Sequence, residues 1–190
     1  MIQLSAVMWA GALFFAFIGI GRTVSKEMIS LSGIILGLFF LHQFDNQIRG
    51  VLLGNLPPDQ KFYVQAAIFL VIVFFAYQTR ALVGMEATRA RSNVNPEGRD
   101  TLQGNVLGGI VGFINGYLIM GTLWYFLDIN RLPNSQYPLD PYVVAPPAGS
   151  PSAEAVASLP LYVLAGGPSG SGDLLALAVI VLFLIVLVVI

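Results

Sequence analysis

The chain alternates long apolar runs with short charged or proline-rich segments. Five apolar runs are visible, and each is bounded by polar or charged residues. A helix needs about 20 apolar residues, with a range of about 17–25, to cross the hydrocarbon core of a bilayer, and these runs are close to that length. The pattern predicts an all-α, polytopic membrane bundle of four core transmembrane helices plus a fifth, C-terminal helix. The predicted helices cover residues 4–20, 28–44, 62–77, 105–127 and 174–190.

Polar residues mark the starts of two of these helices. "SKE" precedes the second run, so Ser25 is a candidate N-cap and Glu27 lies near the positive end of the helix. Before the third run, Pro57 and Pro58 break the chain, and Asp59 is a candidate N-cap.

The segment 128–172 has a different composition from the rest of the chain. It holds eight of the eleven prolines and ends in a cluster of glycines. Such a composition forms neither a long helix nor a packed core, so we expect an extended or disordered segment unless a partner holds it. The predicted organisation is a four-helix membrane domain (1–127), an extracytoplasmic Pro/Gly-rich loop (128–172) and a C-terminal helix (173–190).

Composition places the chain in the membrane. Hydrophobic residues make up 56% and charged residues 10%, whereas soluble domains carry about 25% charged residues. The formal net charge is −1 and no basic run exists, so nucleic acid is not an expected partner. There is no cysteine, which excludes disulfides, iron–sulfur clusters and thiolate zinc sites.

Basic residues predict the orientation, because Lys and Arg in short loops resist translocation. The arginine-rich segment 79–100 is expected to extend the third helix into the cytoplasm and to turn at Asn95–Pro96. One side of the bundle receives six basic residues and the other three, which predicts an extracytoplasmic N-terminus. The six, which we expect to set the topology and to contact headgroups, are Arg22, Lys26, Arg80, Arg89, Arg91 and Arg99; the three are Arg49, Lys61 and Arg131.

Glycine recurs every fourth residue in the stretch "GNVLGGIVGFING". Each glycine costs a helix roughly 1 kcal/mol relative to alanine, but residues four apart share one face, and small residues let helix backbones approach in lipid. Three uses remain open: packing within the bundle, oligomerisation through the fourth helix, or a glycine-lined pore. The expected packing residues are Gly104, Gly108, Gly112 and Gly116, with Gly33 and Gly37 on the second helix.

Few residues could carry chemistry. The single histidine, His42, could ligate haem or chlorophyll if the chain belongs to a bioenergetic complex, and is otherwise an interfacial residue. The carboxylates lie near helix ends, not at the membrane depth expected of an ion pathway. Gln65 and Asn115 are expected to hydrogen-bond across helices. No nucleophile, phosphate-binding or metal-binding motif is visible, so we predict no catalytic residue, metal or cofactor.

Two stretches resemble a known family. "GIGRTVSKEMISLSGIILGLFF" resembles the opening of the colicin V production protein (CvpA) family, and "LQGNVLGGIVGFINGYLIMGTLWYFL" resembles its later "LGGxxGxxxGxLxxxxL" segment. The resemblance covers residues 8–127 and ends near 128. It implies a bacterial inner-membrane protein associated with toxin production or export and with envelope homeostasis. No molecular activity comes with it.

These observations predict a non-catalytic membrane protein that acts through helix packing and partner binding. The bilayer surrounds it, and residues 128–190 are expected to reach other membrane-protein subunits. One alternative is an accessory or assembly subunit of a large photosynthetic, respiratory or export complex. A second is a homo-oligomeric channel or transporter whose fourth helices line a central pathway.

Overall fold

The computed structural model describes residues 3–22, 24–78 and 98–189, and over these residues the chain is helical without a β-strand. The predicted all-α fold is confirmed. Four helices form the bundle: α1 (Leu4–Ile20), α2 (Val24–Gln43), α3 (Pro58–Gln78) and α5 (Gly98–Ile129). A π-helical turn, η1 (Asn46–Leu52), follows α2, and α6 (Pro151–Val156), α7 (Pro160–Ala165) and α8 (Asp173–Val189) complete the chain.

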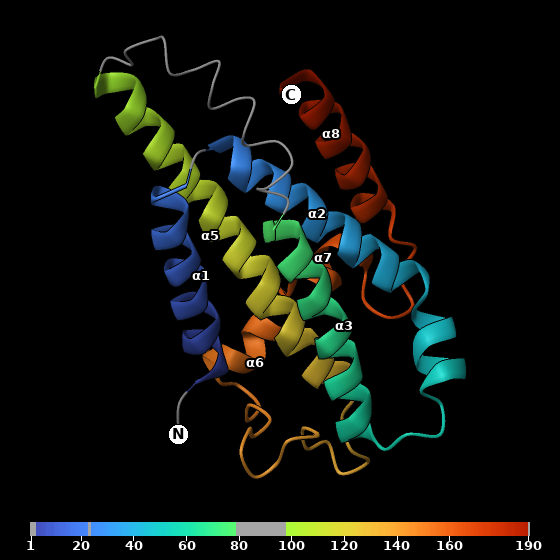
Figure 1. Cartoon of the computed structure of the whole chain (residues 1–190). Coiled ribbons are helices and arrows are strands. Elements are labelled where there is room, and N and C mark those ends of the chain that lie inside the picture. Colours follow the sequence, from blue (N-terminus) through green and yellow to red (C-terminus); the bar gives the residue numbers. More distant parts are fainter. Residues whose placement is uncertain (1–2, 23, 79–97, 190) are drawn as a thin grey trace.

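The bundle is organised around α5, the longest helix (Figure 1). α1 lies along α5 in the most extensive helix contact of the structure. α2 packs against both α3 and α5, and α8 lies along the other side of α2. α7 packs against α5 and links the bundle to α8. The two chain ends lie at opposite ends of the molecule (Figure 1).

Within the described part of the chain, three helices are long and apolar enough to cross a membrane: α2, α3 and the part of α5 from Gln103 to Ile129. α1 and α8 are apolar but shorter, with 17 residues each. The chain is therefore a multi-pass helical membrane protein.

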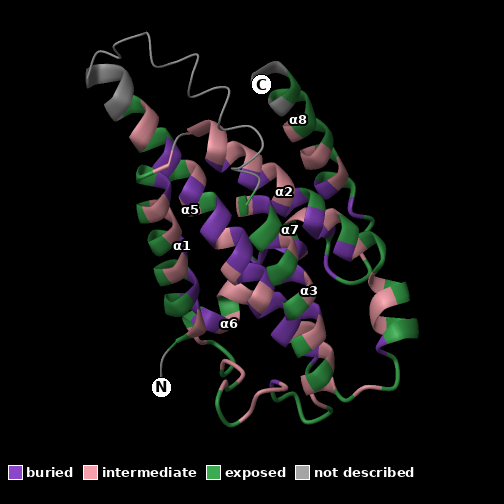
Figure 2. Ribbon diagram, viewed as in Figure 1, coloured by how far each residue is buried: buried purple, intermediate pink, exposed green. Residues whose placement is uncertain are grey.

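Burial follows the helix contacts (Figure 2). The interior between α2, α3 and α5 is filled by Ile34, Leu38 and Phe69, which are completely buried. Large apolar side chains point outward from the helices of the bundle, including Phe17 on α1 and Phe75 on α3. A water-soluble protein would bury such side chains, whereas a bilayer accepts them at no cost.

Two helix starts differ from the sequence prediction. α2 begins at Val24, so Ser25 lies inside the first turn and is not the N-cap. α3 begins at Pro58, so Asp59 is likewise a first-turn residue. Proline suits the first position of a helix because its missing N–H would have no partner there. The predicted turn at Asn95–Pro96 lies outside the described residues.

The segment 128–172 is folded on the chain's own bundle and is neither extended nor disordered. Its apolar residues Tyr137, Leu159 and Leu161 are buried, although prolines surround them. Ser150 caps α6 by accepting a hydrogen bond from the Ala153 amide at 3.2 Å. Composition alone missed this because a few apolar side chains between prolines can pack against an existing helix end. We call this folded segment the cap.

Candidate functional site

α1 packs directly on the glycine face of α5. A Cβ atom at Gly112 would lie 2.5 Å from the carbonyl oxygen of Phe15 and 3.0 Å from the Cα of Gly19. One at Gly108 would lie 2.5 Å from the carbonyl oxygen of Gly19, and Gly116 also faces the α1 backbone. Only hydrogen atoms fit between these backbones. In this structure α1 of the same chain fills the face that oligomerisation or a pore would require.

The other glycines of the sequence prediction differ in their surroundings. A Cβ at Gly104 would meet nothing within 4 Å. On α2, Gly33 faces the Cβ of Ala76 and Gly37 faces Ile72, so these two glycines lie at the contact with α3. Glycine therefore recurs every fourth residue on α5 for one turn more than the contact with α1 requires.

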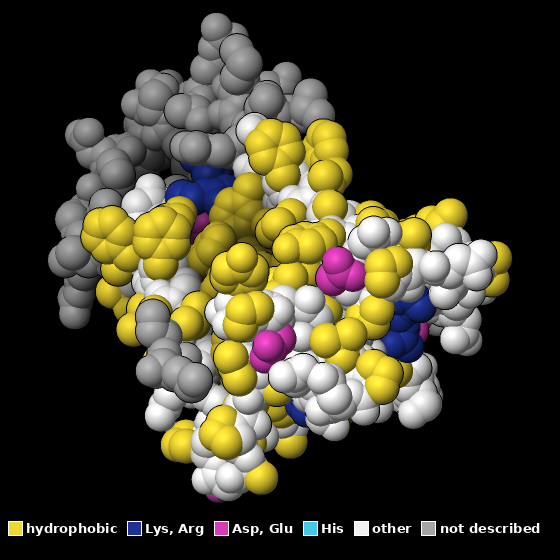
Figure 3. Space-filling model, turned by 90° about the horizontal axis from the view of Figure 1, so that it is seen from below, with side chains coloured by type: hydrophobic (Ala, Val, Ile, Leu, Met, Phe, Trp, Pro, Cys, Tyr) yellow, Lys and Arg dark blue, Asp and Glu magenta, His cyan; other side chains and the backbone are white. Residues whose placement is uncertain are grey.

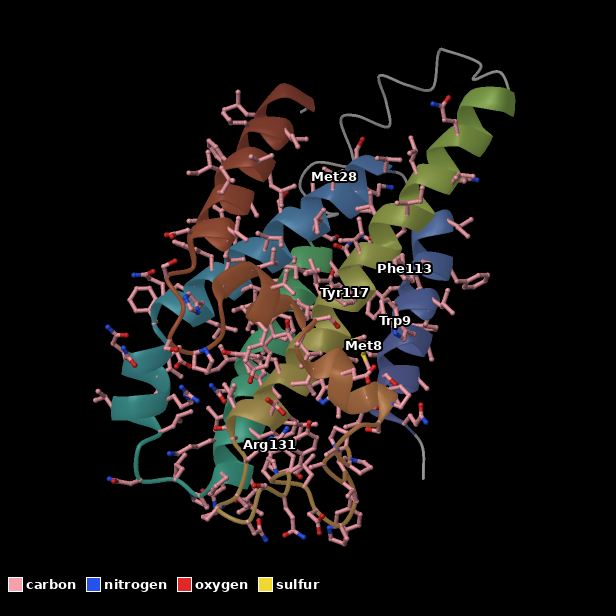
Figure 4. The ribbon with its side chains drawn as sticks, turned by 180° about the vertical axis from the view of Figure 1, so that it is seen from behind. Met8, Trp9, Met28, Phe113, Tyr117 and Arg131 are labelled. Carbon is pink, nitrogen blue, oxygen red and sulfur yellow. The ribbon has the colours of Figure 1, made fainter. Side chains whose placement is uncertain are left out.

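Aromatic rings cover one side of the α1–α5 contact (Figure 4). The Trp9 ring stacks between Phe113 and Tyr117, with centroids 6.0 Å and 5.8 Å away. Stacked aromatic pairs add stabilisation beyond the area that they bury.

A buried carboxylate lies where α1, α2, α3 and α5 meet. Glu27 has no exposed surface, and one of its carboxylate oxygens lies 3.1 Å from the Arg22 guanidinium. The other oxygen accepts hydrogen bonds from the Asn115 amide at 2.8 Å and the Tyr77 hydroxyl at 3.4 Å. The Arg22 guanidinium also lies 4.5 Å above the Tyr77 ring. We call these four residues the Glu27 cluster.

The contacts within the Glu27 cluster do not satisfy all of its buried polar atoms. Among the described residues, the Arg22 Nε, the Asn115 Oδ1 and the ion-paired Glu27 oxygen have no hydrogen-bond partner, although all three atoms are buried. A buried charge requires its counter-charge, because desolvation is otherwise too costly. The sequence prediction placed Glu27 near the start of a helix, as the structure does, but did not predict that its side chain is buried inside the bundle. The basic Arg22 five residues earlier was the available signal.

The two polar residues expected inside the bundle are both buried and bonded. Asn115 belongs to the Glu27 cluster. Gln65 accepts a hydrogen bond from the Asn130 amide at 2.6 Å, and that amide also donates to the Phe126 carbonyl at 2.8 Å. These bonds join α3 to the end of α5.

The basic residues expected at headgroups divide into two groups. Arg22 turns inward to Glu27, with 11% of its side chain exposed, whereas Lys26 is half-buried on the first turn of α2. Arg80, Arg89 and Arg91 lie outside the described residues. Arg99 belongs to α5, but its side chain is not described.

His42 lies at the end of α2, against the first residues of the C-terminal helix. A Cβ at Gly172 would lie 2.8 Å from the imidazole. The cavity beside His42, shared with Asp45 and Gln65, measures about 10 Å³, which is enough for about one water molecule. Within the described part of the chain, no group of three or more metal-ligating residues converges.

The cap is held to α5 through Asp128. Its carboxylate accepts hydrogen bonds from the hydroxyls of Tyr162 at 2.7 Å and Tyr137 at 3.2 Å, and pairs with Arg131. The Trp124 indole donates to the Tyr137 oxygen at 2.8 Å. Burial raises the pKa of Tyr137 to about 12 and also raises the pKa of Tyr162, where the bond to Asp128 adds to the effect.

The fold and these contacts define a small, multi-pass helical membrane protein whose polar groups are engaged in holding the bundle together. The family model described as "Colicin V production protein" matches residues 4–150. The chain belongs to the colicin V production protein family, which confirms the resemblance seen in its sequence. No curated protein and no solved structure gives a significant match.

Proposed function

We propose that this protein is a non-catalytic membrane subunit that binds other membrane proteins through its C-terminal helix. The observation that carries the proposal is the placement of α8, which the cap attaches to the outside of the bundle. α8 packs against α2 and α7, and Leu175 at its start is completely buried. Further along, Phe183 and Leu187 are 64% and 65% exposed. Figure 1 shows α8 at the outer edge of the bundle, and the exposed side chains of this helix are apolar.

A photoreactive amino acid placed at Phe183 tests this proposal in growing cells. Phe17 on α1 is the matched control, because it is also an outward phenylalanine and is 75% exposed. We expect ultraviolet light to link position 183 to another membrane protein and position 17 mainly to lipid. The proposal is wrong if both positions give the same lipid adducts and no protein adduct.

The partner of α8 is either a different membrane protein or a second copy of this chain, and purification distinguishes the two. After extraction in a gentle detergent, an accessory subunit would purify in fixed ratio with larger membrane proteins. A self-assembling protein would instead purify at a small multiple of its 20.4 kDa mass. Membership in the colicin V production protein family supports a role in toxin production or export, or in envelope homeostasis.

We further propose a bacterial inner-membrane location with the N-terminus and the cap outside the cytoplasm. The chain has no cysteine, so a single Tyr142→Cys variant gives a clean test at a cap residue that is 93% exposed. A membrane-impermeant thiol reagent should label this cysteine in intact cells. Labelling only after lysis would reverse the proposed orientation.

A further inference from the structure

A polar cleft opens at the end of the bundle that carries the cap. Its volume is about 300 Å³, and it lies between η1, the start of α3 and the end of α5. Lys and Arg side chains gather on this face beside an acidic group (Figure 3). The cleft is lined by three cations, Arg49, Lys61 and Arg131, together with Asp45 and the side-chain amides of Asn46 and Asn130.

The three cations of the cleft come together from different parts of the chain. The structure describes three Lys or Arg side chains at this end of the bundle, and all three line the same cleft. They come from separate elements, since Arg49 belongs to η1, Lys61 to α3 and Arg131 follows α5. With Asp45 as the acidic side chain in the lining, the cleft carries an excess of positive charge in a chain whose net charge is −1.

The three cations differ in how far their charges are already balanced. Arg49 donates to Asp45 at 2.8 Å and, more weakly, to the carbonyl of Ile129 at 3.5 Å. Arg131 pairs with Asp128. Among the described residues no carboxylate lies within ion-pair distance of Lys61. Lys61, a half-buried residue, thus has no ion-pair partner among the described residues, and the nearby guanidinium groups retain unused donors.

The position of the cleft favours an amphiphile. It lies at the start of α3 and the end of α5, two helices long and apolar enough to cross a membrane, and the ends of such helices are where lipid headgroups are expected. Next to Arg49 in the chain, Val51 and Leu52 are 83% and 70% exposed. Such apolar side chains beside a cationic cleft match a ligand that has an anionic head and an acyl tail.

We propose that this cleft binds the phosphate group of an anionic phospholipid, with Lys61 as its principal counter-charge. Guanidinium and ammonium groups are the usual partners of phosphate oxygens. Lys61 lies on the first turn of α3, so its neighbourhood also has the positive end of the helix dipole. This inference stands independently of the proposed partner on α8.

The test uses the full chain purified in a neutral detergent, with native mass spectrometry to count bound lipids. We expect phosphatidylglycerol to bind at one saturable site and phosphatidylcholine, which has no net charge, to bind at least tenfold more weakly. Lys61→Gln should weaken phosphatidylglycerol binding by about tenfold, because one charge-assisted contact is lost. The matched control Lys61→Arg keeps the positive charge at the same position and should bind phosphatidylglycerol about as tightly as the unmodified chain does.

Three results would overturn the proposal. Equal binding of the two lipids, or equal effects of Lys61→Gln and Lys61→Arg, would show that the cleft does not select the anionic head. Tight binding of glycerol phosphate with no binding of phosphatidylglycerol would assign the cleft to a soluble phosphate compound. Circular dichroism verifies that Lys61→Gln is folded, as expected for a residue that makes no ion pair.

Discussion

Gly112 offers the sharpest test of how α1 and α5 are held together. A methyl group there would lie 2.5 Å from the Phe15 carbonyl oxygen, whereas ordinary contacts begin at 3.4 Å. The obstructing atoms belong to the α1 backbone, so no side chain can rotate away and the helices must separate by about 1 Å. A gap of that size forfeits a quarter to a half of each dispersion contact nearby.

We therefore expect Gly112→Ala to lower the free energy of unfolding by about 2 kcal/mol, within the usual range for overpacking. Gly104→Ala is the matched control, since it makes the same change two turns earlier on the same helix and face, in open space. Alanine's helix propensity should leave that variant unchanged or up to about 1 kcal/mol more stable. The assay is unfolding of the purified protein in mixed micelles by increasing dodecyl sulfate, followed by far-UV circular dichroism. Equal stability of the two variants would refute the reasoning.

Two further predictions concern the polar contacts. Glu27→Met should destabilise the fold by about 3 kcal/mol in the same assay, because it leaves the Arg22 charge nearly buried and unpaired. The double variant Arg22→Met/Glu27→Met should lose less than the sum of the two single variants, and strict additivity would argue against the ion pair. The folded-state pKa of Tyr137, about 12, is above the ordinary value of 10, so its contribution to stability is complete below pH 10 and is lost as the pH rises from 10 to 12. Comparing the unfolding of Tyr137→Phe with that of the unmodified chain over this range should isolate the loss; identical pH profiles would contradict it.

The hydrophobic pattern predicted the helices well, because each apolar run has to lie in lipid. The first predicted run, 4–20, has the same bounds as α1. The start of α2 was placed four residues too late, since hydropathy stops at Met28 while Lys26 and Glu27 are already helical. Hydropathy treats every charged residue as exposed. It therefore does not detect a charged residue that is helical and whose side chain turns into the bundle.

The sequence did not predict which helices lie next to one another in the bundle. The spacing of the glycines identified a face for close packing, but several helices carry small residues and the pattern does not choose among them. The three cations of the cleft were counted as topology signals on separate loops, because nothing in their local sequence shows that η1, α3 and the end of α5 meet. Such convergence depends on the tertiary fold.

The pairing of α1 with α5 also has a consequence for synthesis. Roughly 90 residues of chain separate Gly19 from the Gly108 that it contacts, and a ribosome adds about 5–20 residues per second. α1 therefore waits about 4–18 s in the bilayer before its partner exists, with the backbone at Gly19 uncovered. During that interval an α5 from a neighbouring chain offers the same surface. Slower translation or crowded insertion should thus increase the fraction of chains that exchange α1.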